Sequence, residues 1–510
     1  MARSSIRKRL AVAALALAAC GGKGAPKGKT GRPPTALERA YPALRFAPAD
    51  ASWVLAVARV GDAALALRET GELAAAVEGS RLADLDAAAR GAFGLSPLSP
   101  DDLAAAGIQL DGSGAIFGQA GFPTAILPVA DAEKLRRFLD GKRPELGAEA
   151  AEHRGHQIVS WSRGEVGVSW VVLDGWLVLR AAPAAAGPAW LDQILAAPGG
   201  GSLGADPELA EVARRGEAAL GAPAGVLALV RFDRLAREIE DARSFRPELP
   251  VCARALAAAA PRLVGAALVG QDGVDGWAAL ELAPGAAGAL RDHTGPPAPG
   301  GFYAYRAKAP LAIALAVALP WLEKVRAAAG CPLLDRPIRD PVRAMTGMSG
   351  PRAIYAAATR IDIDDLDGGG ALHMVLTDQD LVTAQLESIP GRSLFERKRT
   401  IAGREVVALS FPGAPTILYR QEGRRFTAAL GDRAMAAVLG PGQQPEHLEI
   451  AGAWLEPRRI RNLEALLAIR FPRRTAQAVA TWLHKYQRAS AVLQLEGDSV
   501  VFRGSLRPHR

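Results

Sequence analysis

The sequence predicts an α+β fold made of two related units of antiparallel sheet with helices packed on one face. Apolar runs are repeatedly joined by tight Asp-Gly or Glu-Gly turns, which are the strongest local signal for a β-hairpin. Helix starts carry a capping side chain, then proline, then acid. Few segments are typical of βαβ crossovers, which favours antiparallel over parallel sheet.

The chain begins with the pattern of an export signal. Basic residues cluster before residue 10, an apolar run follows over residues 10–19, and small residues precede Cys20. We therefore predict a signal peptide over residues 1–19. A helical run of this length reaches only about 15 Å, half of the roughly 30 Å hydrocarbon core, so it is too short to span a membrane.

The run Leu-Ala-Ala-Cys at residues 17–20 resembles the lipobox of bacterial lipoproteins. The resemblance implies that the signal is cleaved before Cys20 and that Cys20 is acylated, which anchors the chain to a membrane. In proteobacteria, aspartate after this cysteine favours the inner membrane. Gly21 follows here, so the resemblance implies the outer membrane, facing the periplasm, if the host is Gram-negative. An ordinary cleaved signal with an incidental Cys20 is the alternative.

Residues 20–45 are rich in Gly, Pro and Lys, which predicts a flexible tether. Eight of the 61 Lys and Arg residues lie in residues 1–32, where there is no acid. The other 53 therefore balance the 53 Asp and Glu residues. Because nucleic-acid binding requires clustered positive charge, we expect no nucleic-acid partner.

A Pro/Gly linker is predicted over residues 285–300, between unit 1 at residues 46–284 and unit 2 at residues 301–510. The two units share short matches in one order, which predicts an internal duplication. The matched segments are 124–131 with 371–378, 155–159 with 403–407, 227–232 with 466–471, and 271–284 with 495–508.

Local signals place individual elements in both units. Hairpins are predicted at the turns Asp174-Gly175, Glu422-Gly423 and Glu496-Gly497. Helices are predicted to begin after Ser99 and Asp206, each followed by proline and then acid.

The phrase Phe-Ala-Pro-Ala-Asp at residues 46–50, before an apolar strand, and the strand–Asp–helix–strand module of residues 125–161 resemble the DUF3352-like proteins. These are bacterial envelope proteins of unknown function. The likeness covers most of residues 46–284 and, more faintly, 301–508. It implies a fold and a compartment, and it supplies no catalytic residues.

Cysteine usage agrees with export. Apart from Cys20 the chain has only Cys252 and Cys331, which would meet an oxidising compartment after export. We predict that these two form a disulfide, with two buried free thiols as the alternative.

Metal sites have little support. Four aspartates precede a triple glycine and are a weak Ca²⁺ candidate, but their spacing does not fit an EF-hand, and an acidic hairpin tip explains them equally well. His153 and His156 flank a turn, which favours a solvated loop over a metal site. The four aspartates are Asp362, Asp364, Asp365 and Asp367.

No cofactor or catalytic motif is complete. Residues 24–30 resemble a phosphate-binding loop but have three residues between the glycines where four are needed. Residues 347–350 lack one residue of a nucleophile elbow. Tryptophans in predicted strands are expected to be core, with glycan or lipid binding as the alternative. They are Trp53, Trp161, Trp170, Trp176 and Trp277.

These observations favour a lipid-anchored envelope protein with a non-catalytic binding or scaffolding role. A protein partner in the envelope is left open. One alternative is a carrier of a lipid or other apolar ligand, which predicts an apolar cavity of several hundred Å³. Another is a hydrolase of envelope polymers, which predicts converging carboxylates or a Ser–His pair in a cleft.

Overall fold

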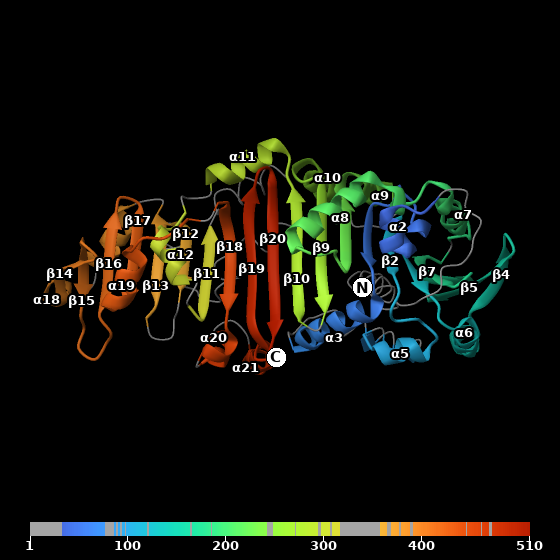
Figure 1. The fold of residues 1–510 in the computed structure, drawn as a ribbon, viewed down its shortest axis with the longest axis horizontal. Helices are drawn as coiled ribbons and strands as arrows, with labels where there is room; N and C mark the ends of the chain where they lie inside the picture. The colour runs from blue at the N-terminus through green and yellow to red at the C-terminus, as the bar shows by residue number, and fades with distance from the viewer. Residues whose placement is uncertain are drawn as a thin grey trace. The chain divides into compact units, whose positions relative to one another are not determined.

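Two compact units make up the part of the chain that is described. Unit 1 holds the residues up to 257 and residues 261–278, and unit 2 holds residues 258–260 and those from 279 onward. Each is an antiparallel sheet with helices packed against it, so the predicted α+β class with two sheet units is confirmed (Figure 1). The computed structural model describes residues 33–509 except 77–85, 88–89, 92–93, 97, 120–121, 164–165, 185, 242–247, 271, 294–296, 307–308, 317–357, 365–368, 377–378, 388–390, 445, 461 and 469–471.

The strands of unit 1 pair in the order β10-β9-β8-β1-β2-β3-β7-β6-β5-β4. From β9 to β4, every neighbouring pair is antiparallel. The first strand, β1, therefore lies inside the sheet, between β2 and β8. The strands are β1 (Trp53–Val57), β2 (Gly114–Gln119), β3 (Phe122–Pro128), β4 (Glu149–His153), β5 (His156–Arg163), β6 (Val166–Leu173), β7 (Trp176–Pro183), β8 (Val226–Arg231), β9 (Arg262–Gly270) and β10 (Gly273–Glu281), whose last residues fall in unit 2.

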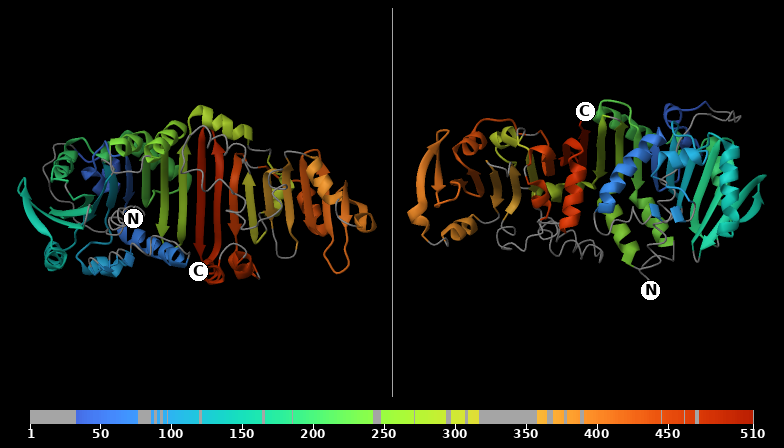
Figure 2. Two further views of the ribbon diagram at one scale, coloured as in Figure 1. Left: turned by 180° about the vertical axis from the view of Figure 1, so that it is seen from behind. Right: turned by 90° about the horizontal axis from the view of Figure 1, so that it is seen from below.

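Helices of unit 1 bury apolar faces against this sheet. Leu135 and Leu139 of α6 share one core cluster with Val159 of β5 and Trp170 of β6, and Figure 2 shows α6 beside these strands. The helices are α2 (Ala36–Ala40), α3 (Val60–Ala76), α5 (Pro100–Ala105), α6 (Ala132–Leu146), α7 (Trp190–Ala196), α8 (Pro207–Leu220), α9 (Phe232–Asp241) and α10 (Glu248–Ala259), with 3₁₀ turns η2 (Pro42–Phe46), η3 (Ala197–Gly199) and η4 (Leu203–Ala205).

Unit 2 repeats the topology of unit 1. Its strands pair in the order β20-β19-β18-β11-β12-β13-β17-β16-β15-β14, and each pair is antiparallel. Adding ten to every strand label of unit 1 reproduces this order. The strands are β11 (Leu311–Ala316), β12 (Ala358–Asp364), β13 (Ala371–Leu376), β14 (Glu396–Ile401), β15 (Arg404–Leu409), β16 (Ile417–Glu422), β17 (Arg425–Leu430), β18 (Leu448–Leu455), β19 (Tyr486–Glu496) and β20 (Ser499–Pro508).

The core of unit 2 is closed around small and aromatic side chains. Phe302, Leu418 and Met435 are fully buried in one cluster that also contains Ala371 and Ala429. The helices are α11 (Pro284–His293), α12 (Gly300–Arg306), α17 (Asp380–Glu387), α18 (Arg392–Phe395), α19 (Asp432–Leu439), α20 (Leu463–Ala468) and α21 (Arg473–Leu483), with a 3₁₀ turn η6 (Pro457–Arg459).

Equivalent turns carry equivalent backbone strain. The β4–β5 turn places Arg154 at φ 49° and Gly155 at φ 76°, and the β14–β15 turn places Ala402 at φ 51° and Gly403 at φ 73°. A non-glycine residue at positive φ is uncommon, and here it recurs at the same topological position. Two left-handed residues in a row are what a two-residue hairpin of type I′ requires.

Three of the four sequence matches between the units fall on equivalent strands, and one is wrong. Segment 227–232 begins in β8, whose topological counterpart is β18, whereas Leu466 lies in helix α20. A short apolar run fits a buried helix as well as a strand, so periodicity alone could not separate them. Residues 469–471 of that match lie outside the described residues.

Two predicted boundaries also need correction. Thr35 caps α2 in a capping box with Glu38, and Leu44 in η2 is fully buried, so the predicted tether of residues 20–45 overlaps folded chain. Because the residues before Thr35 are rich in Gly, Pro and Lys, the capping box of Thr35 and Glu38 was not recognised as the start of a helix. Residues 284–293 form α11, so the predicted linker of residues 285–300 is partly helical, with Pro284 at its first position.

The predicted local signals are confirmed. All three hairpins form as β6–β7, β16–β17 and β19–β20, and Ser99 and Asp206 cap α5 and α8 through their side chains. Among the described residues, none of the helices combines the length and apolarity needed to cross a bilayer.

Candidate functional site: a pocket around a buried arginine

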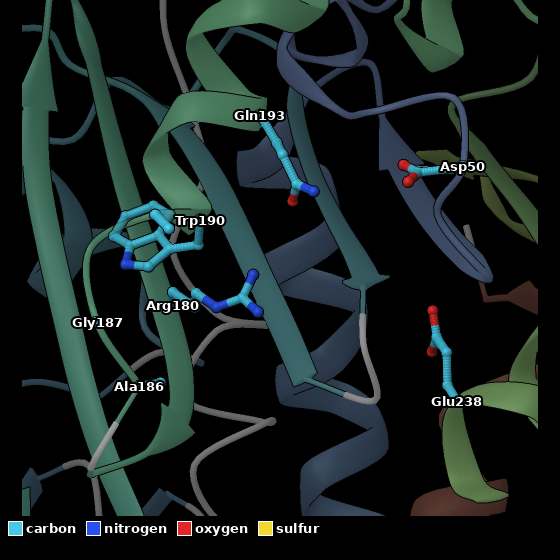
Figure 3. Close-up of a pocket in the computed structure, with 8 residues that line it drawn as sticks. Asp50, Arg180, Ala186, Gly187, Trp190, Gln193 and Glu238 are labelled. Carbon is cyan, nitrogen blue, oxygen red and sulfur yellow. The ribbon is translucent and has the colours of Figure 1, made fainter. Parts of the chain in front are cut away.

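Unit 1 contains a pocket of about 370 Å³ whose walls come from distant parts of the chain. Arg180 enters from β7, Trp190 and Gln193 from α7, Asp50 from the segment before β1, and Glu238 from α9 (Figure 3). The loop residues Ala186, Gly187 and Ala189 complete the lining with small side chains, so this side of the pocket stays open.

Arg180 is the dominant group of the pocket. Its backbone lies opposite Thr124 in the β3–β7 ladder, and its side chain is only 8% exposed. The guanidinium donates one hydrogen bond, from Nη1 to Thr124 Oγ1 at 3.3 Å, and its carbon lies 5.9 Å from the centre of the Trp190 ring. Among the described residues, Nε has no hydrogen-bond partner. A guanidinium has five N–H donors, so the buried Nε–H is a donor that the described residues leave unused.

Burial lowers the pKa of Arg180 from its ordinary value to about 10, and the nearby Glu238 opposes this shift. At neutral pH the side chain is therefore still a cation. A buried cation with one long hydrogen bond carries an uncompensated desolvation cost. An anionic group in the pocket would offset that cost.

Two carboxylates form the opposite side of the pocket. Figure 3 shows the carboxylates of Asp50 and Glu238 facing each other, across the pocket from the guanidinium of Arg180. Ser52 Oγ donates to Glu238 Oε2 at 2.8 Å, which fixes that carboxylate. The pocket thus has a cationic side and an anionic side.

A second buried arginine holds the segment that carries Asp50. Arg231, at the end of β8, donates from Nη1 to the carbonyl of Ala51 at 3.1 Å, and Arg234 donates to the carbonyl of Ala49 at 2.9 Å. Arg231 is also ion-paired to Asp206 and, at 2.6 Å, to Glu208. These bonds fix the backbone on both sides of Asp50.

Unit 1 also holds an apolar pocket of about 180 Å³. Leu55 and Val57 of β1, Leu67 of α3 and Val226 of β8 contribute to its lining, and the lining residues that the structure describes are all uncharged. Ligand pockets commonly measure roughly 300–1,000 Å³, so this cavity is small for a lipid.

Unit 2 has no charge at the position equivalent to Arg180. The match of residues 124–131 with 371–378 places Ala371 at Thr124, and the ladder pairs Ala371 with Ala429, as it pairs Thr124 with Arg180. Both alanines are buried in the cluster around Phe302. The buried arginine at this ladder position is therefore a difference between two units of the same topology.

The sequence-predicted sites lie elsewhere. His153 Nε2 lies 2.8 Å from Asp192 Oδ1, and Arg154 pairs with the same carboxylate at 2.7 Å. The ring of His153, at the end of β4, is thus partnered by the Asp192 carboxylate of α7. Among the described residues, no group of three or more His, Cys, Asp or Glu side chains is arranged to hold a metal.

Several candidates fall outside what the structure describes. Asp362 and Asp364 lie in β12, which pairs with β13 as expected for an acidic hairpin. Their side chains lie outside the described part of the structure. Cys252 lies in α10 and is disulfide-bonded. Its predicted pairing with Cys331 stays a prediction. The residues outside the described part are Cys20, Cys331, Asp365 and Asp367, together with the segments 24–30 and 347–350.

The tryptophans in strands belong mainly to the core. Trp170, Trp176 and Trp277 are buried, whereas Trp53 and Trp161 are half-buried and pack against the unit 1 cluster. Sequence reasoning missed the pocket residues. Arg180 left a signal, because it is the only charged residue in the two strands of the β6–β7 hairpin.

No family model matches the chain, and no curated protein matches it. A solved structure described as "Structure of crystal form III of TP0453" is 9% identical over 49% of this chain and 86% of that chain, with a TM-score of 0.27. A second, "Structure of crystal form IV of TP0453", is 10% identical over 49% of this chain and 84% of that chain, with a TM-score of 0.28. Likeness at this level supports no conclusion about fold or function.

Proposed function

We propose that this protein is a lipid-anchored component of the cell envelope that binds a small ligand without converting it. The binding role depends on one observation: Arg180 is a buried, incompletely bonded cation in the wall of an open pocket. Convergent polar groups in a pocket of this size are typical of a small-molecule site. Among the described residues that line the pocket, the groups able to act as a nucleophile or general base are the carboxylates of Asp50 and Glu238.

The anchor is supported by the sequence alone. Basic residues, a short apolar run and the tripeptide before Cys20 together match a lipoprotein signal. A single acyl chain binds a membrane only weakly, so stable anchoring needs a second chain or basic residues nearby. Lys23, Lys27 and Lys29 follow Cys20 and would contact anionic headgroups.

Acylation is tested by expressing the full chain with its own signal in a Gram-negative host. We expect mass spectrometry to find an N-terminal acylated Cys20, and we expect the protein in the membrane fraction. Cys20→Ala should move most of it out of that fraction, whereas Ser5→Ala, a mild change in the signal, should not. An unprocessed chain that starts at Met1 and stays soluble would refute the anchor.

The membrane that retains the protein is tested separately. Density-gradient separation should place the acylated chain in the outer membrane of the Gram-negative host. Gly21→Asp should shift it toward the inner membrane, because the residue after the acylated cysteine governs sorting in the lipoproteins that the signal resembles. Equal distribution of both variants would contradict this part of the proposal.

A hydrolase is the second candidate, since Asp50 and Glu238 share one pocket and glycoside cleavage uses two carboxylates. Release of soluble fragments from purified cell-wall polymer by the full chain, abolished in Glu238→Gln, would favour it over binding alone. The carrier alternative has weaker support, because the apolar pocket measures only about 180 Å³.

A further inference from the structure

The charges of the Arg180 pocket select among ligands. A simple anion would gain from Arg180 but would also meet Asp50 and Glu238, whose negative charges oppose it. A simple cation would gain from the carboxylates and be opposed by Arg180. A molecule that carries both charges satisfies both sides at once, because Figure 3 places the cation and the carboxylates on opposite sides of the pocket.

We infer that the pocket binds a compact zwitterion, with its anionic group against Arg180 and its primary ammonium between Asp50 and Glu238. This inference rests on the proposed binding function and names its ligand class. The same chemistry occurs in a free amino acid or peptide and in the phosphoethanolamine headgroup of a lipid.

The surroundings of each charge suit this ligand. The Arg180 guanidinium carbon lies 5.9 Å from the centre of the Trp190 ring, and Figure 3 shows the terminal nitrogens directed away from the indole, toward the side of Asp50 and Glu238. Gln193 adds an amide that can donate or accept. On the other side, Ser52 orients the Glu238 carboxylate, and Arg231 holds the backbone next to Asp50, so these elements are positioned before a ligand arrives. Preorganised groups lose less entropy on binding.

The experiment is isothermal titration calorimetry on the full chain in detergent. The probes are L-alanine and O-phosphoethanolamine, with acetate, inorganic phosphate and methylamine as single-charge controls. We expect at least one zwitterion to bind with a Kd of about 1 mM or lower and every single-charge probe to bind at least tenfold more weakly. Preference for L-alanine identifies an amino-acid or peptide ligand, and preference for O-phosphoethanolamine identifies a headgroup.

Arg180→Gln should weaken zwitterion binding at least tenfold, and Asp50→Asn and Glu238→Gln should each weaken it at least threefold. The matched controls are Arg214→Gln and Glu211→Gln, an exposed ion pair on α8, which should leave the affinity within twofold. Asp50 is exposed, so Asp50→Asn tests the pocket even if Arg180→Gln does not fold.

Acetate or phosphate binding as tightly as the matching zwitterion would overturn the inference, as would the absence of binding by both zwitterions. The inference would also be overturned if the pocket variants bound the zwitterion with the same affinity as the control variants. These outcomes are independent of the acylation test, since a chain without ligand can still be acylated at Cys20. The experiments therefore distinguish a wrong ligand class, which the titrations would show, from a missing lipid anchor, which mass spectrometry would show.

Discussion

Arg180 and Arg231 are both buried arginines on strands of unit 1, and their surroundings differ. Arg231, 3% exposed, is ion-paired to Asp206 and Glu208 and also donates to backbone carbonyls. Arg180 has one hydrogen bond, to Thr124. Breaking a buried ion pair leaves a charge uncompensated, whereas removing Arg180 relieves a desolvation cost and loses one 3.3 Å hydrogen bond and the attraction of Glu238.

Arg180→Met should therefore leave the free energy of unfolding unchanged or raise it by about 1 kcal/mol in the absence of ligand. Arg231→Met should lower it by roughly 3–5 kcal/mol, since Asp206 and Glu208 lose their buried partner. Urea denaturation of both variants measures the contrast. A loss of 2 kcal/mol or more in Arg180→Met would show that this arginine is structural.

Tyr41 links stability to alkaline pH. Its hydroxyl donates to the carbonyl of Ala224, and burial raises its pKa from 10.0 to about 12. Above pH 10 the unfolded chain loses this proton while the folded chain keeps it. The stabilisation is therefore fully present below pH 10 and is lost as pH rises through about 12.

Tyr41→Phe should cost about 1–3 kcal/mol at pH 7, because the Ala224 carbonyl loses its donor. Between pH 10 and 12 the difference from wild type should shrink by up to about 2.7 kcal/mol, two pKa units at 1.36 kcal/mol each. Denaturation curves over this range measure it. Arg180, whose pKa is lowered, changes the pH dependence of stability in the opposite direction over this range. Because wild type and Tyr41→Phe both contain Arg180, its contribution cancels in the difference between them. A constant difference would contradict the pKa shift.

At the scale of elements, α8 approaches β9 unusually closely. A Cβ at Gly216 would lie 2.4 Å from Cβ of Ala266, too near for two carbon atoms. A glycine inside a helix costs about 1 kcal/mol relative to alanine, so its presence here reflects packing. Gly141, inside α6, has open space around it and no such reason.

Gly216→Ala should destabilise the protein by about 1–3 kcal/mol through overpacking, whereas Gly141→Ala should stabilise it by about 1 kcal/mol. The double variant Gly216→Ala/Ala266→Gly should recover most of the loss. Thermal unfolding compares the three proteins. If Gly216→Ala stabilised the protein as Gly141→Ala is expected to do, the overpacking argument would be wrong. Helix α8 would then be able to move away from β9 with no loss of stability.

Elements were predictable where the signal was local. The Asp174-Gly175 turn and the Ser99 cap act through their own backbone neighbours, so their residue types suffice. The pocket was not predictable, because Asp50, Arg180 and Glu238 are far apart in sequence and meet only through strand order and helix packing. The unexpected charge of Arg180 in an apolar hairpin was the one local trace of it.

The whole molecule contains one topology twice, with different interiors. In unit 1 the β3–β7 ladder carries Thr124 and Arg180 beside a pocket, and in unit 2 the β13–β17 ladder carries Ala371 and Ala429 in an apolar core cluster. The same backbone arrangement therefore accepts either a buried charge or apolar side chains at this position, depending on the side chains around it.

Ala429→Arg should lower the stability of unit 2 by about 3 kcal/mol or more, because Ala429 is 3% exposed and packs among apolar side chains, so the new guanidinium would be buried. Hydrogen exchange along β13 and β17 measures the effect in that unit alone. Unchanged protection would mean that unit 2 has room for the side chain, as unit 1 does.

The position of β1 and β11 in the interior of their sheets also affects how the chain folds during synthesis. Each strand is produced early in its unit, yet one of its edges is covered only by β8 or β18, which are produced late. Contacts between residues so distant in sequence slow folding, and an uncovered strand edge invites pairing with other chains. A newly made chain of this topology therefore depends on protection from aggregation until the last third of each unit has emerged.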